Sequence, residues 1–432
     1  MVTASLRLGD HCLKIGSGAT PRGGKEAYLA EGPFSLIRSQ NVLNDRFSFS
    51  GLAFISQDQA DQLSNVEVQP GDVLLNITGD SVARVCQVDP IVLPARVNQH
   101  VAIIRPNPEV IDPRFLRYFL VSPEMQAHML GLAASGATRN ALTKGMIEKF
   151  EIPAVPLPEQ RAIANTLGAL DDKIELNRKM NETLEAMARA LFRDWFVDFG
   201  PTRAKMEGRP AYLSEDLWSL FPDRLDDEGK PEGWAAGTLN DLASLNPESW
   251  TARNAPARVS YVDLANTKWG SIDKVENYAW ADAPSRARRI LRAGDTIVGT
   301  VRPGNGSFCY VAEDGLTGST GFAVLRPKNA RDRVFVWCAS TSVENINRLN
   351  HLADGGAYPA VRPDAVAATE IVIPSEVVLA AFRDALSANV ELIGTNNAES
   401  RTLAQTRDLL LPRLISGELK MEVARTAEGV SL

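Results

Sequence analysis

The sequence has few cysteines and no long apolar run, and these two absences already narrow the class of protein. The four cysteines, Cys12, Cys86, Cys309 and Cys338, are scattered and form no C-x-x-C pair. This pattern favours reduced thiols in a cytoplasmic protein over a disulfide framework or a metal site. No apolar stretch approaches the ~18 residues that span a bilayer, and the N-terminus lacks the apolar core of a signal peptide. We therefore expect a cytoplasmic protein with no membrane partner.

The motifs of the common enzyme classes are also missing. There is no G-x-G-x-x-G after a strand, no H-E-x-x-H and no G-x-S-x-G. Residues 18–26 fail the phosphate-loop pattern, because Glu26 stands where a hydroxyl would bind Mg²⁺. Asp223, Glu228 and Lys230 imitate a nuclease pattern, but two-metal chemistry needs rigidly placed carboxylates and these lie in a connector. We predict no catalytic residue, no metal site and no cofactor site in this chain.

A net positive charge, which would favour nucleic acid, is absent as well. The formal net charge is −7, but the acidic excess lies in the helical segments and the linker. The two globular segments described below are close to neutral, and basic clusters such as residues 286–289 remain available. DNA affinity depends on where basic side chains gather rather than on their total. Charge therefore neither establishes nor excludes a DNA partner.

What the sequence does contain is an internal duplication. Residues 69–75 (QPGDVLL) return as 292–298 (RAGDTIV), residues 99–106 (QHVAIIRP) return as 320–327 (TGFAVLRP), and residues 151–153 (EIP) return as 372–374 (VIP). The copies are offset by about half the chain, far more than the repeat of a solenoid. They indicate two related globular domains, each followed by a long helix.

Short apolar runs bounded by Gly, Pro, Asn and Asp predict strands in both copies. Helices are expected over 112–129 and 332–350, where each copy closes. The expected fold class is α+β: two homologous mixed α/β domains joined by two long coiled-coil helices, which are antiparallel if the family resemblance described below holds. The expected boundaries are 1–155 for the first domain, 156–200 for its helix, 201–236 for a linker, 237–374 for the second domain, and 375–432 for the distal helix and tail.

The two helical segments share one heptad frame. Apolar or polar seam positions step by four and three residues, and adding 219 to the first series gives the second. The seam residues are Ile163, Leu167, Leu170, Ile174, Asn177, Leu184, Leu191, Phe382, Leu386, Ile393, Asn396, Leu403 and Leu410. A 3.5-residue seam over several heptads favours coiled-coil packing, and an asparagine in the seam costs stability but fixes register. Pairing of the two helices is the more economical interpretation; packing of each helix on its own domain stays open.

At this point the residues resemble a known family, the specificity subunits of type I restriction-modification systems. Residues 152–163 (IPAVPLPEQRAI) are similar to the family's opening of the central helix, and 409–419 (LLLPRLISGEL) to its distal ending. The recurring Leu8-Gly9-Asp10 and Gly-Asp steps match its target-recognition domains. One departure is Ser375-Glu376-Val377, where the second copy should repeat P-x-E-Q.

The resemblance implies a non-catalytic, sequence-specific DNA-recognition subunit. Each domain would read one half of a split, asymmetric site on double-stranded DNA, and the helix pair would set the gap between the halves. It further implies two methyltransferase (modification) subunits docked on this chain, with restriction and translocase subunits added to that core. S-adenosylmethionine, ATP and Mg²⁺ are expected on those partner subunits and not on this chain.

Loop residues that could touch DNA are those able to pair with bases or phosphates. Arginine reads guanine, asparagine and glutamine read adenine, and basic side chains hold phosphates. The candidates are Arg22, Lys25, Arg38, Gln40, Asn41, Thr138, Arg139, Asn140 and Lys144 in the first domain, and Arg253, Lys268, Trp269, Arg302, Asn305, Tyr358 and Arg362 in the second. For each of them a solvated surface side chain is the alternative.

Two other functions stay open from the sequence. One is a free-standing DNA-binding regulator that uses both domains without enzymatic partners. The other is a transferase whose catalytic residues are too dispersed to recognise. Methylation or cleavage by the purified chain alone would favour the transferase. Tight specific binding without affinity for a methyltransferase would favour the regulator.

Overall fold

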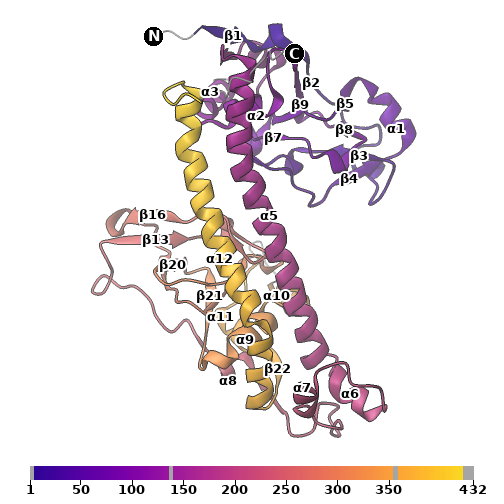
Figure 1. Cartoon of the computed structure of the whole chain (residues 1–432), viewed down its shortest axis with the longest axis vertical. Helices are drawn as coiled ribbons and strands as arrows, with labels where there is room; N and C mark the ends of the chain where they lie inside the picture. Colours follow the sequence, from indigo (N-terminus) through magenta and orange to yellow (C-terminus); the bar gives the residue numbers. More distant parts are fainter. Residues whose placement is uncertain (1–3, 136–139, 354–358, 422–432) are drawn as a thin grey trace, which may run out of the picture. The chain divides into compact units, whose positions relative to one another are not determined.

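The computed structural model describes residues 4–135, 140–353 and 359–421 (Figure 1). They form two compact units. Unit 1 comprises Met1–Ile174 with Arg401–Leu432, and unit 2 comprises Glu175–Ser400. Each unit therefore contains one copy of the duplicated sequence together with part of both long helices.

Unit 1 contains three small sheets. A two-stranded sheet pairs β1 (Ser5–Arg7) with β10 (Glu151–Pro153). The first four-stranded sheet has the order β2 (Cys12–Ser17), β9 (Val101–Pro106), β6 (Val73–Asn76) and β7 (Val85–Gln87). The second has the order β4 (Ala53–Ile55), β3 (Phe34–Ile37), β8 (Ala95–Val97) and β5 (Glu67–Val68).

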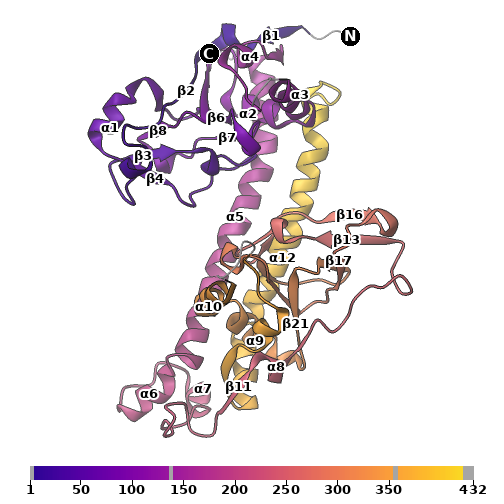
Figure 2. The same cartoon turned by 180° about the vertical axis from the view of Figure 1, so that it is seen from behind.

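Unit 2 (Figure 2) repeats the strand order of these three sheets and adds one hairpin. β11 (Ala235–Thr238) pairs with β22 (Glu370–Ile373). One sheet has the order β12 (Ala243–Leu245), β21 (Phe322–Pro327), β18 (Thr296–Gly299) and β19 (Phe308–Tyr310). The other has the order β16 (Glu276–Ala279), β13 (Arg258–Val262), β20 (Leu316–Ser319) and β17 (Ala287–Ile290), and a separate hairpin joins β14 (Thr267–Lys268) to β15 (Ser271–Ile272). The duplication in sequence is thus a duplication of fold.

Strand β6 of unit 1 and its counterpart β18 of unit 2 are buried on both faces, because each lies between two apolar layers. Successive side chains of a strand point to opposite faces. Val73 and Leu75 therefore pack towards helices α2 (Pro113–Val121) and α3 (Pro123–Ala134), whereas Leu74 packs towards the second sheet. In unit 2, Val298 and Ile297 divide in the same way. This explains why the repeated segments are continuous apolar runs rather than alternating ones.

The helices that close each copy are interrupted, unlike the single helices expected over 112–129 and 332–350. The first becomes α2 (Pro113–Val121) and α3 (Pro123–Ala134), and the second becomes α9 (Arg333–Ser340) and α10 (Val343–Ala353). Ser122 caps α3 by accepting a bond from the Met125 amide, and Pro123 follows as its first residue. A proline has no amide hydrogen to continue α2, so the expectation of one helix was wrong.

The remaining helices are short except for two. The short ones are α1 (Gln57–Gln62), α4 (Lys144–Ile147), α6 (Gly200–Met206), α7 (Glu215–Ser219), α8 (Leu239–Leu242) and α11 (Pro363–Ala367). Both α5 (Leu157–Phe196) and α12 (Glu376–Ile415) have 40 residues, or roughly 60 Å at 1.5 Å per residue. No helix in these described ranges is long and apolar enough to cross a membrane.

Helices α5 and α12 pair within each unit, and in opposite directions. In unit 1, Ile163 and Leu167 near the start of α5 share a core with Leu414 near the end of α12. In unit 2, Phe192 near the end of α5 packs on Phe382 near the start of α12, with ring centroids 6.3 Å apart. The expected fold class, two mixed α/β domains joined by two long antiparallel helices, is confirmed.

The predicted seam residues lie along this pairing, and none of them is exposed. Ile163, Leu167, Asn177, Phe382, Leu386, Ile393 and Asn396 are buried; Leu170, Ile174, Leu184, Leu191, Leu403 and Leu410 are half-buried. Each helix also packs on a sheet domain, so the two packing modes weighed from the sequence coexist.

The segment 201–236, expected as a connector, packs into unit 2. The Phe221 ring lies 4.9 Å from Trp195 of α5, and the Trp234 ring lies 5.8 Å from Phe196. Phe221 and Trp234 are almost completely buried. These aromatic side chains tie the connector to the end of α5 by burying apolar surface.

Candidate nucleic-acid interface

The repeated Gly-Asp and Arg-Pro motifs form a structural ion pair in each unit rather than a reactive site. Asp72 accepts two hydrogen bonds from Arg105, at 2.7 and 2.8 Å, and a third from the Gln69 amide. In unit 2, Asp295 accepts two bonds of 2.9 Å from Arg326 and one from the Arg292 amide. Paired and fully bonded in this way, the buried carboxylates hold adjacent strands in register.

In unit 1, the ends of several strands bring separate loops to one edge of the sheets. β2 ends at Ser17 opposite Ala102, and β6 ends at Asn76 opposite Val101. β3 ends at Ile37 beside Val97, the last residue of β8. The loops that follow are therefore neighbours, and the side-chain amide of Asn76 joins two of them by donating to the Ser39 carbonyl at 2.8 Å. We call this edge the loop edge of unit 1.

Unit 2 builds the same edge with the same backbone hydrogen bonds. The Ile77 amide donates to the His100 carbonyl at 3.0 Å, and the Thr300 amide donates to the Gly321 carbonyl at 2.8 Å. The returning loop pairs through the bridge Thr78↔Ala141 in unit 1 and through Val301↔Ala360 in unit 2. The frame is common to both units, whereas the side chains mounted on it differ. Loops on a rigid scaffold are where binding residues usually lie.

The first-domain candidates divide between this edge and other places. Arg38 and Gln40 lie in the loop after β3 and both donate to the Gly51 carbonyl. Asn140 is exposed beside Gly79, whose amide donates to the Asn140 carbonyl at 3.3 Å. Lys144 is 64% exposed and lies 3.6 Å from Glu148.

Two first-domain candidates are placed less favourably, and three cannot be placed. Asn41 is fully buried, and its side chain bonds the Arg38 amide and the Ser48 carbonyl, so it holds the loop and is not carried into the proposed interface. The Arg22 carbonyl accepts from Gln59 of α1, which follows β4 at the opposite strand ends. Thr138, Arg139 and the side chain of Lys25 lie outside the described residues.

Most second-domain candidates meet at the equivalent edge. Lys268 Nζ lies 3.5 Å from Ser307 Oγ, and the Trp269 amide donates 2.7 Å to the Gly306 carbonyl. Arg302, Asn305 and Arg362 are exposed on the loops paired by the Val301↔Ala360 bridge. Arg253 lies in the segment that leads into the opposite end of β13, and Tyr358 lies outside the described residues.

Sequence reasoning missed several polar side chains at the loop edges. In unit 1, His100 Nδ1 lies 2.6 Å from Thr78 Oγ1, and His100 Nε2 lies 3.0 Å from the side-chain nitrogen Nε2 of Gln99. In unit 2, Arg286 is more than half exposed and pairs with Asp263. The sequence did contain a signal for His100. Gln99-His100 stands where the second copy has Thr320-Gly321, and a pair that differs between two copies of a repeat indicates a variable surface.

A buried charge cluster fixes the loop after β3 onto the helices of unit 1. Asp171 of α5 accepts bonds from Arg117 of α2 at 2.7 Å and from Arg407 of α12 at 2.9 Å. Asp45 of that loop lies 3.7 Å from both arginines. Burial opposes the charge on Asp171, but Arg117, Tyr118 and Arg407 together hold its pKa below the ordinary value. Burial raises the pKa of Asp45 despite the same arginines.

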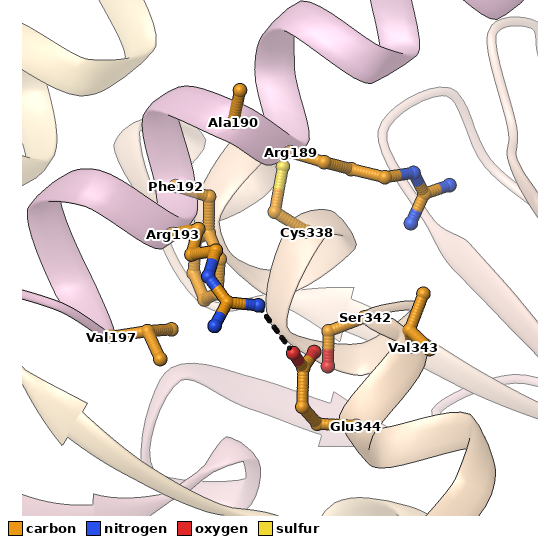
Figure 3. A pocket seen from close by; sticks show the side chains of 9 residues that line it. All are labelled: Arg189, Ala190, Phe192, Arg193, Val197, Cys338, Ser342, Val343 and Glu344. Carbon is orange, nitrogen blue, oxygen red and sulfur yellow. Dashed lines mark hydrogen bonds and ion pairs between the residues drawn. The ribbon is translucent and has the colours of Figure 1, made fainter.

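A cavity of about 330 Å³ lies in unit 2 between α5 and the junction of α9 with α10 (Figure 3). Arg193 and Glu344 form an ion pair of 2.9 Å at its side. The Cys338 thiol faces it, and burial raises the pKa of this thiol to about 12, so the thiol is protonated at neutral pH. Across the described residues, no group of three or more His, Cys, Asp or Glu side chains could hold a metal ion.

Fold and site define a class of protein: a tandem-domain molecule in which two related sheet domains carry matched but chemically different loop edges and share an antiparallel helix pair. Comparison with known proteins shows what the chain is similar to. Residues 5–186 match the model of the type I restriction modification DNA specificity domain. The resemblance drawn from the sequence is confirmed.

Two relatives and one solved structure are similar to this protein over most of the chain. The chain is 24% identical over 434 residues to the type I restriction enzyme HindI specificity subunit of Haemophilus influenzae, covering 89% of this chain and 94% of that protein. It is 25% identical over 346 residues to the MjaIX specificity subunit of Methanocaldococcus jannaschii, covering 76% and 74%. The S subunit of a type I system from M. genitalium has the same fold, with a TM-score of 0.52, 15% identity and 95% of each chain covered.

Proposed function

We propose that this chain is the DNA-recognition subunit of a type I restriction-modification complex and that it reads an asymmetric site made of two separated halves. One observation carries the proposal. The two units build their loop edges with the same backbone bonds but mount different side chains on them, such as His100 in unit 1 against Gly321 in unit 2. Two domains that share one backbone frame but carry different loop side chains are suited to recognising two different half-sites.

The helix pair is the proposed spacer between the half-sites. Both helices have 40 residues, and the seam contains Asn177, which donates to Glu399 at 2.8 Å and to Ser400 at 3.2 Å. Polar seam contacts of this kind favour one register over its neighbours. A fixed register gives a fixed distance, and a fixed distance gives a defined gap in the DNA site.

The chemistry is assigned to partner subunits. The chain would hold two methyltransferase subunits and, through them, the restriction and translocase subunits. S-adenosylmethionine, ATP and Mg²⁺ would bind those subunits, and the methyltransferase would flip the target adenine out of the duplex. This chain would contribute DNA binding and assembly without a catalytic residue of its own.

The test is co-expression with the methyltransferase subunit of the same proposed type I system. We expect a stable complex with two copies of that subunit, which methylates one interrupted, asymmetric sequence in a randomised DNA library. Neither subunit alone should methylate the library. Specific DNA binding with no affinity for the methyltransferase would replace the proposal with the free-standing regulator, and methylation by the chain alone would replace it with an enzyme.

A further inference from the structure

Arg302 adopts a backbone conformation that side chains normally avoid. Its φ is 48° and its ψ is 63°, in the left-handed region. The Cβ of an L-residue is crowded there, so glycine is the usual occupant. The next residue is Pro303, and a residue before proline is further restricted to extended conformations. Two separate steric rules therefore disfavour an arginine at this position.

The equivalent residue in unit 1 is a glycine. Gly79 has a φ of 75°, and its amide donates to the Asn140 carbonyl at 3.3 Å. The Arg302 amide donates in the same way to the Pro359 carbonyl at 2.9 Å. The bonds on either side correspond as well, so the two residues occupy one position of one frame. One unit fills that position with the residue that the backbone favours, and the other fills it with an arginine.

Packing within the protein does not explain the exchange. Arg302 is exposed, and no hydrogen bond or ion pair of its guanidinium is found among the described residues. The side chain therefore does not offset its backbone cost by contacts in this part of the chain. Strained residues of this kind collect at functional sites, where the surrounding structure holds them.

The surroundings fix the arginine and give it a basic, polar setting. The Asn305 amide donates back to the Arg302 carbonyl at 2.9 Å, and the Gly304 amide donates to Asn350 at 3.2 Å. Arg362 is exposed on the loop that pairs with this one through the Val301↔Ala360 bridge. Unit 1 has Asp80 in the corresponding turn after Gly79. The two edges thus differ in charge at this point.

We propose that Arg302 determines the specificity of the second domain by donating two parallel hydrogen bonds to a guanine in the second half-site. This deepens the proposed function and rests on it. A phosphate contact needs only a nearby positive charge, which Arg362 and Lys268 supply from unstrained backbone. A guanine edge must be approached by a guanidinium from one direction, and the strained, hydrogen-bonded turn fixes the direction in which the Arg302 side chain leaves the backbone.

The decisive variant is Arg302→Gly, because it installs the residue that the first unit uses and relieves the backbone. In the purified complex with the methyltransferase, methylation of a library randomised in the second half-site is measured. We expect a melting temperature equal to or above that of the wild type, an unchanged first half-site, and at least a tenfold loss of preference at one guanine position. Arg302→Lys keeps the charge but cannot form the paired bonds, so it should lose the same preference.

Arg209→Gly is the matched control, since Arg209 is an exposed loop arginine of unit 2 that is not among the DNA-contact candidates, and it should leave the preference unchanged. If Arg302→Gly weakens methylation of all sequences equally and Arg302→Lys restores it, Arg302 contacts a phosphate, and the proposal is overturned. A lowered melting temperature with intact preference would show a structural role and overturn it too, as would no change at all. A wild-type complex that methylates no interrupted site would instead refute the proposed function.

Discussion

The guanidinium of Arg326 donates two hydrogen bonds of 2.9 Å to the carboxylate of Asp295, one in parallel with the other. In unit 1, Arg105 donates two hydrogen bonds to Asp72 in the same manner. The most visible repeat of the sequence therefore preserves a strand-locking ion pair and not a binding site. In unit 2, Glu248 adds a second acidic partner by accepting from Arg326 and from Arg292.

Replacing Asp295 with alanine should destabilise unit 2 by about 3 kcal/mol, because it leaves a partly buried guanidinium without its main partner. The Asp295 side chain is 1% exposed and that of Arg326 is 24% exposed. The measurement is urea unfolding followed by tryptophan emission, which reports on unit 2 since all 7 tryptophans lie in residues 175–400. Asp282→Ala, at an exposed carboxylate, is the control, and equal losses in both variants would contradict the assignment.

Glu248 makes part of this stability depend on pH. Hydrogen bonds from Arg292 and Arg326 lower the pKa of Glu248 from 4.5 to about 2. A carboxylate with a depressed pKa in the folded protein stabilises it above the ordinary value, and this stabilisation disappears as the pH falls from about 4.5 towards 2. The stability difference between wild type and Glu248→Gln should therefore be largest near pH 6 and shrink by pH 3. A difference that stays constant or grows on acidification would refute this.

The two buried asparagines of the helix seam should lower the stability of the helix pair and fix its register. Asn177 and Asn396 are both buried between α5 and α12, and Asn396 donates 2.8 Å to Asn181. The double variant Asn177→Leu/Asn396→Leu should unfold at a higher urea concentration and also form oligomers visible by light scattering, because an all-apolar seam accepts other registers and partners. Asn347→Leu adds a leucine at an exposed site of α10 and controls for apolarity. A double variant that is less stable and strictly monomeric would count against the register role.

The long helices were predictable because periodicity is a local property of the sequence. The seam from Ile163 to Leu410 could be written down from spacing alone, and so could the α+β class from the turn residues. The break at Pro123 was available in the same way, since proline starts helices more readily than it continues them. It was missed because the apolar pattern of 112–129 runs through it.

The loop edges could not be predicted, because they depend on which strand ends lie together. Nothing local shows that residues 38–41, 77–81 and 98–100 are neighbours, and Asn41 looked like a base reader until its amide was found inside the loop. Likewise, the offset of the repeat pairs Gly79 with Arg302, but only the shared backbone bonds show that the two residues occupy one position of the frame. Sequence spacing identifies the frame, whereas the residues that distinguish the loop edges of the two units require the fold.

The most direct test of the account lengthens the proposed spacer. Seven residues continuing the heptad are inserted after Ile174 in α5 and after Ser400 in α12, so that the antiparallel seam stays in phase. The same residues inserted after Gly208, which is exposed between α6 and α7, serve as the control. Base-resolution methylation mapping in cells with the complete system should show both half-sites unchanged and the gap longer by about three base pairs, since seven residues add about 10 Å of helix. An unchanged gap in a methylating complex would contradict the account.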